Sequence, residues 1–263
     1  MSSQSPIAPG ILADLEASGF ATRTFLRLDE ERRGAVLAAI FEEASKAGPD
    51  RILIKDVAAR AGVPVGSLYQ YFGNRENLAR CATLLVSRKL VADLETWTPY
   101  LAEMPLREAL STYLRSGLEW GSAEAASLRS FVAVAYGSAP RSSPFGTMRD
   151  MSRSGGTGGD GDGAGAGDEG WPRKTLVEPV AAALQGMVRA VFEAAERRGE
   201  LRVGLDVEVA ARLAGALLIA VGDSIFMPGL DSYYRLFDEA HGAEAMIDQA
   251  VGFIVRSVQP DRK

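Results

Sequence analysis

The sequence predicts an all-α fold, and three observations support this prediction. Apolar residues recur every three or four positions through most of the 263 residues. No stretch alternates apolar and polar residues over a length that would require a β-strand. Glycine and proline stand between the periodic segments, where helices end. The chain is long enough to bury a substantial core in one large domain or two modest ones.

The first 28 residues are expected to form a mobile N-terminal arm. A Ser/Pro-rich tail opens the chain, residues 11–20 can form a short helix, and Arg23 and Arg27 precede the folded domain. Such an arm can reach a DNA minor groove, and a solvated basic tail is the alternative.

A scaffold helix is expected to start at Asp29 and to end at Gly48-Pro49-Asp50. Two glutamates in its first turn suit the positive end of the helix dipole. Its apolar residues at helical spacing are Val36, Leu37, Ile40, Phe41 and Ala44.

The stretch from Ile52 to Leu78 predicts two short helices joined by a tight turn. The first spans Lys55 to Ala61, Gly62 suits the left-handed end of a helix, and Pro64 fits the first turn of the next one. A brief helix braced across a glycine turn is the helix-turn-helix layout that enters a DNA major groove. The residues expected to contact DNA are Lys55, Val65, Gly66, Ser67, Tyr69, Gln70, Tyr71 and Arg75.

At these residues the chain resembles the TetR family of transcriptional regulators. The resemblance rests on the helix from Val36 to Ala47, on IKDVAARAGV, and on GSLYQYFGNRENL, in that order and over about a quarter of the chain. Two residues depart from the family pattern: Ile54 and Pro64 stand where Ser or Thr often caps a helix.

The resemblance implies a helix-turn-helix DNA-binding domain over residues 29–75 and a helical ligand-binding and dimerisation domain over residues 76–258. It also implies a homodimer formed through the last two helices, a palindromic double-stranded DNA operator and a small-molecule effector. Repression is the commoner role in the family, and activation would use the same DNA-binding domain. The operator, the effector and the target genes cannot be read from the sequence.

Charge is distributed unevenly along the chain. The net charge is -5, which argues against indiscriminate coating of nucleic acid. Between residues 51 and 80, however, five basic residues outweigh two acidic ones, a local balance of +3. The basic residues are Arg51, Lys55, Arg60, Arg75 and Arg80. This pattern favours a site-specific DNA binder with a separate acidic domain.

Asn74 is expected to cap a long helix that connects the two domains and ends near Trp97, before Pro99. The helix start, with Arg75 beside it, can hold a DNA phosphate, and simple capping is the other interpretation. Further helices are expected over residues 106–121, 123–139 and 175–198, from Asp206 through an apolar segment at 210–225, and over 243–258.

The Gly-rich segment at residues 152–170 predicts a disordered surface loop. A phosphate-binding loop would need a preceding strand and a Lys-Ser/Thr ending, and a single Gly-Asp run is a poor calcium repeat.

Few residues are suited to catalysis or metal binding. The single cysteine, Cys81, excludes an internal disulfide, and it is either a small buried side chain or a reactive sensor thiol. The single histidine, His241, is expected at an exposed turn. We therefore expect no metal site, no cofactor and no enzymatic activity, although a helical enzyme or a small-molecule-binding adaptor without DNA affinity stays an alternative. Neither a signal peptide nor a membrane span is expected, so the predicted location is cytoplasmic.

An effector would need an apolar cavity in the second domain. The residues proposed to line it, each of which could equally belong to the core, are Trp97, Trp120, Phe131, Tyr136, Met187 and Phe192.

Overall fold

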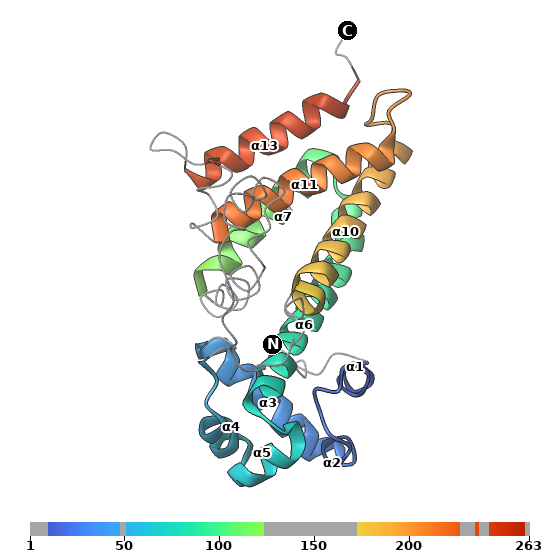
Figure 1. Ribbon diagram of the computed structural model, residues 1–263. Coiled ribbons are helices and arrows are strands. Elements are labelled where there is room, and N and C mark those ends of the chain that lie inside the picture. The colour runs from blue at the N-terminus through green and yellow to red at the C-terminus, as the bar shows by residue number, and fades with distance from the viewer. Residues whose placement is uncertain (1–9, 48–50, 124–172, 227–234, 237–241, 261–263) are drawn as a thin grey trace, which may run out of the picture.

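The computed structural model describes residues 10–47, 51–123, 173–226, 235–236 and 242–260, and within these ranges every regular element is helical. Figure 1 shows one cluster of helices, here called the head, at one end of the long helix α6, and a second bundle of helices, the body, at the other. The expected all-α architecture is therefore confirmed.

The head is built on α3 (Glu30–Ala47), α4 (Ile54–Ala61) and α5 (Val65–Phe72). Its core contains fully buried side chains from all three helices: Leu37, Ile40, Val57, Leu68 and Phe72. Gly62 ends α4 with φ of 66°, the left-handed conformation that the sequence predicts. Neither α4 nor α5 has a side-chain cap, which agrees with the apolar residues at both helix starts.

The described part of the expected arm is folded, so residues 10–28 correct the prediction of a mobile segment. They form α1 (Ile11–Ser18) and α2 (Arg23–Leu26). Ile11, Leu15 and Phe25 are fully buried in the head core. The Phe25 ring lies 5.0 Å from that of Phe72, measured between centroids. Burial of these apolar side chains outweighs the tendency of a chain terminus to remain unstructured.

The long helix α6 runs from Arg75 to Glu103 and passes through Pro99, where the sequence predicts its end. Proline removes one backbone hydrogen bond and normally breaks a helix. Here the turn beyond Pro99 is held from outside, because Leu101 is buried in the body core and the Arg198 guanidinium donates to the carbonyl oxygens of Ala102 and Met104, at 2.6 and 2.7 Å. Tertiary contacts therefore extend α6 by one turn.

The body contains α7 (Leu106–Ala123), the π-helical turn η2 (Arg173–Val177), α10 (Glu178–Arg197), α11 (Val207–Phe226) and α13 (Ala243–Val258). Its core is formed by buried aliphatic residues and Phe192. The expected cap of α11 is present, since Asp206 Oδ1 accepts from the Val209 amide at 3.0 Å. The expected helix beyond residue 123, the Gly-rich loop at 152–170 and His241 lie outside the described residues.

One stretch of the described chain, Lys174–Arg197, is long and apolar enough to cross a membrane by length and composition alone. Core helices of soluble proteins pass the same test. Here the buried face of α10 carries Leu184, Met187, Val188, Val191 and Phe192 into the body core.

We expect Phe25→Ala to lower the free energy of unfolding by about 3 to 5 kcal/mol, because it removes a fully buried aromatic ring from the head core. Thr24→Ala, at an exposed neighbouring position, should change it by less than about 0.5 kcal/mol. Chemical denaturation followed by circular dichroism measures both. Equal stability of the two variants would contradict a folded N-terminal segment.

Candidate nucleic-acid interface and ligand cleft

One face of α5 is presented to solvent. Leu68 and Phe72, four residues apart, anchor the helix in the core. Val65, Tyr69 and Gln70 lie on the exposed side, and half of the Tyr69 surface is accessible (50%). This face combines an apolar contact, a phenol and an amide, which are groups able to meet base edges and phosphates.

Two of the residues expected on this face are placed differently. Ser67 is half-buried. Tyr71 turns toward the core, where its ring lies 5.8 Å from Phe25 and 6.5 Å from Phe72. Its contribution is therefore mainly to the packing behind α5, which helical spacing alone does not reveal because Phe25 comes from a segment far away in the sequence.

The start of α6 lies beside the helix-turn-helix. Asn74 Oδ1 accepts from the Asn77 amide at 2.8 Å, so the predicted cap is present. Arg75 Nε donates to the carbonyl oxygen of Ile52 at 3.0 Å, which ties this end of α6 to the chain entering α4. Both Arg75 and Lys55, in the first turn of α4, are exposed.

The positive charge counted in the sequence is partly neutralised in space. Arg60 forms ion pairs with Glu42 and Glu43 of α3, at 2.6 and 2.7 Å. Arg80 pairs with Glu76 at 2.6 Å. Arg51, Lys55 and Arg75, the other basic residues of this stretch, are exposed near the starts of α4 and α6.

Thr22 fastens the N-terminal segment to the end of the recognition helix α5. Its amide donates to the carbonyl oxygen of Tyr71 at 2.8 Å, and its hydroxyl donates to the carbonyl oxygen of Gln70 at 2.7 Å. These bonds satisfy carbonyl groups that every helix end leaves open. Arg23 and Arg27, just beyond Thr22, are exposed. Local sequence patterns do not predict these two hydrogen bonds, because Thr22 lies 48 residues before Gln70.

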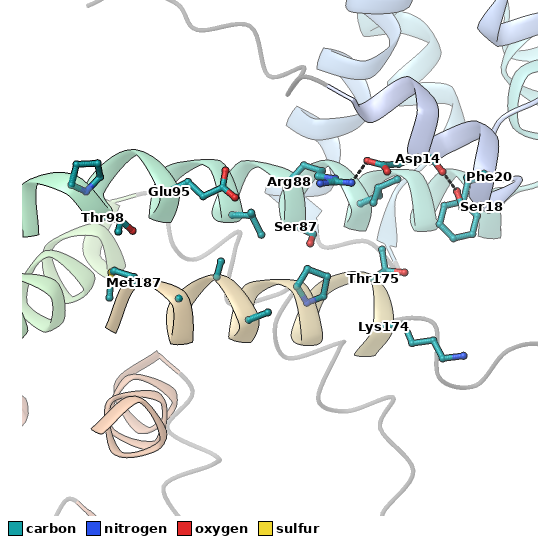
Figure 2. Close-up of a pocket in the computed structure, with 18 residues that line it drawn as sticks. Asp14, Ser18, Phe20, Ser87, Arg88, Glu95, Thr98, Lys174, Thr175 and Met187 are labelled. Carbon is teal, nitrogen blue, oxygen red and sulfur yellow. Dashed lines mark hydrogen bonds and ion pairs between the residues drawn. The ribbon is translucent and has the colours of Figure 1, made fainter. Parts of the chain in front are cut away.

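A cleft of about 900 Å³ lies between α1, α6 and the η2–α10 segment. Figure 2 shows α6 and α10 running along its two sides, with Asp14 of α1 reaching Arg88 of α6.

Of the residues proposed to line an effector cavity, only Met187 borders this cleft. Phe192 is fully buried in the body core, and Trp97 is 59% exposed beside Tyr100. Phe131 and Tyr136 lie outside the described residues. For Trp120 only the backbone is described, as part of α7.

Within the part of the chain that the structure describes, no group of three or more His, Cys, Asp or Glu side chains could hold a metal ion.

Residues 36–81 match the family model described as bacterial regulatory proteins, tetR family. This range extends from α3 into α6 and includes all of α4 and α5. Over these residues the chain carries the N-terminal domain of the TetR family. The helix-turn-helix of the head, formed by α4 and α5, lies within this domain.

Several solved structures share this fold over most of the chain. A putative TetR-family transcriptional regulator from Mesorhizobium loti MAFF303099 is 17% identical with a TM-score of 0.53, covering 91% of this chain and 100% of its own. SmeT from Stenotrophomonas maltophilia, in complex with triclosan, is 17% identical with a TM-score of 0.52, covering 89% and 93%. The reduced form of Escherichia coli NemR is 14% identical with a TM-score of 0.50, covering 89% and 100%. No curated protein matches the sequence significantly.

Cys81 lies fully buried on α6. Burial raises the pKa of its thiol far above the ordinary value. We expect Cys81 to react with a disulfide reagent at pH 8 about a hundredfold more slowly in the folded protein than after denaturation, because little thiolate is present and access requires opening of the core. Absorbance of the released thiol measures both rates. Equal rates would restore the sensor-thiol interpretation.

Proposed function

We propose that this regulator acts in the cytoplasm as a homodimeric repressor that binds a palindromic operator and is released by a small-molecule effector. The observation that supports DNA recognition most directly is the exposed face of α5, with Tyr69 and Gln70, together with exposed Lys55 and Arg75 on the adjoining helices α4 and α6. The outer residues can hold phosphates while α5 meets base edges in the major groove. The proposal involves no catalytic step and no cofactor.

The homodimer is supported by an apolar stripe on the last two helices of the body. Val209, Leu213 and Ala216 repeat along the outer side of α11 at helical spacing, and Leu213 is 68% exposed. On α13, Phe253 is 63% exposed. Large apolar side chains gathered on neighbouring helices mark an interface, and an isologous pairing would bury them against the same helices of a second copy.

Release by an effector is supported by the placement of α6. Its first half lies in the head core and its last turn in the body core, so a change in the body can reposition the head. An effector that prefers one of two arrangements shifts their populations, and a coupling of about 1 to 3 kcal/mol alters DNA affinity by about 5- to 150-fold. SmeT, which shares the fold, is seen with triclosan bound.

Selection of bound sequences from a random DNA pool, followed by footprinting, tests this function. We expect a palindromic site, since a two-fold symmetric dimer contacts two equivalent half-sites. Repression is tested with a reporter gene placed downstream of the selected operator. Deletion of the gene for this protein should raise expression of the reporter. Recovery of no preferred sequence at any salt concentration would contradict the proposal.

On the selected operator, we expect Tyr69→Ala combined with Gln70→Ala to weaken specific binding by at least about tenfold, because both exposed side chains of α5 are lost. Substitution of Tyr69 and Gln70 tests DNA contact without disturbing the fold. Substitution of Tyr71 or Arg75 would not, because their side chains also stabilise the head. Tyr100→Ala is the matched control, since Tyr100 is equally solvent-accessible but lies far along α6. Fluorescence anisotropy measures the affinity, and an unchanged value for the double variant would remove α5 from base recognition.

For the dimer, we expect Leu213→Glu combined with Phe253→Glu to produce monomers, because four charges would be placed in one apolar interface. Light scattering after size-exclusion chromatography measures the mass. Tyr100→Glu, on an exposed face of α6, should leave the dimer intact. A dimer that survives the double substitution would place the interface elsewhere.

A further inference from the structure

The cleft between α1, α6 and α10 has a mainly apolar, elongated lining. Small residues of α10, Ala182, Ala183 and Gly186, leave the space open on one side, and Leu84 and Val91 of α6 face it from the other. From Arg88 to Pro99 the lining follows α6 for about 16 Å, at about 1.5 Å per residue. This shape suits an extended apolar chain better than a compact polar molecule.

The polar groups at the head side of the cleft are mainly hydrogen-bond donors. Arg88 of α6 forms an ion pair with Asp14 of α1. Ser87 is 1% exposed, and Figure 2 shows its hydroxyl directed toward α10. Among the described residues that line this end, Asp14 is the one carboxylate and it already faces Arg88, while Glu95 lies toward the opposite end. A guanidinium with a neighbouring hydroxyl recognises a carboxylate.

We propose that this cleft binds an amphiphilic carboxylate, with its acyl chain along α6 and α10 and its carboxylate on Arg88, where it displaces Asp14. The proposal rests on the function proposed above and identifies the effector class. It also assigns α1 a role: the Asp14–Arg88 pair fastens α1 to α6, and the ligand competes with Asp14 for the same guanidinium.

The structure contains a direct physical connection from this pair to the DNA-binding helix. From Asp14 the chain runs through α1 into Thr22, whose two hydrogen bonds hold the end of α5. Phe25, three residues later, packs against the ring of Phe72 on the same helix. Release of α1 from Arg88 therefore loosens the support behind α5, and DNA affinity falls.

Binding is measured first without DNA, by isothermal titration calorimetry with dodecanoate below its micelle concentration. The wild-type protein should bind dodecanoate, whereas dodecyltrimethylammonium, which has a cationic end, should bind at least about tenfold more weakly. Equal binding of the two amphiphiles, or no binding of dodecanoate, overturns the proposal.

Substitutions at the ion pair should act in opposite directions. Arg88→Gln should weaken dodecanoate binding by about tenfold, because the guanidinium is lost. Asp14→Asn should strengthen it by about two- to fivefold, because the competing carboxylate is removed from a partly exposed pair. Lys89→Gln is the matched control: Lys89 is a neighbouring cation on α6, paired with Asp93 and outside the cleft lining. If the ion pair only stabilises the structure, both Arg88→Gln and Asp14→Asn should weaken dodecanoate binding. That result would refute competition between Asp14 and the ligand for Arg88.

Gly186→Leu tests the location of the acyl chain. A side chain at this position would meet open space and project into the cleft, and leucine favours a helix more than glycine does, so the protein should fold with at least its original stability. Dodecanoate binding should be abolished. If this variant binds dodecanoate as tightly as the wild type and its melting temperature is unchanged, the acyl chain does not lie in this cleft.

The effect on DNA is measured last, with the operator selected above. Dodecanoate should lower the operator affinity of the wild type by at least about fivefold and leave that of Gly186→Leu unchanged. Operator binding without ligand should be the same for both proteins, so loss of DNA recognition is distinguished from failure of the ligand site. Dodecanoate binding that leaves operator affinity unchanged refutes the connection through α1.

Discussion

The structure depends on one constraint: α6 belongs to two hydrophobic cores. Leu78, Cys81 and Leu85 lie in the head core, and Leu101 lies in the body core of the same 29-residue helix. A helix held at both ends transmits displacement along its axis, because its backbone hydrogen bonds resist bending. The contacts of Arg198 with the last carbonyl groups of α6 matter for this reason, since without them the helix would lose support directly after Pro99.

The recognition helix α5 has only eight residues, too few to be stable alone. Its stability comes from what packs behind it: Leu68 and Phe72 in the core, and Thr22 on its terminal carbonyl groups. The exposed side chains are thereby left available for another molecule. The lack of side-chain caps at the starts of α4 and α5 is compensated by this burial, which contributes more than a cap does.

The N-terminal segment links the two halves of the molecule in a second way. It covers the head core with Ile11 and Leu15, borders the cleft with Asp14, and holds α5 through Thr22. Packing of the core and the ion pair with Arg88 therefore both involve one short helix, α1. The helix α6 is therefore connected to α5 both by direct packing and through the N-terminal segment.

The sequence alone determined the helical class, the helix-turn-helix and the resemblance to the TetR family, because these depend on local patterns: periodic apolar residues, a left-handed Gly62, and the Asn74 cap. It also placed the starts of α11 and α13, whose boundaries follow local composition. Only the tertiary structure decided the packing of residues 10–28 into the head core, the passage of α6 beyond Pro99, the inward turn of Tyr71 and the neutralisation of Arg60. Each of these arises from a contact between residues distant in the sequence, whose energy outweighs a local preference of the chain.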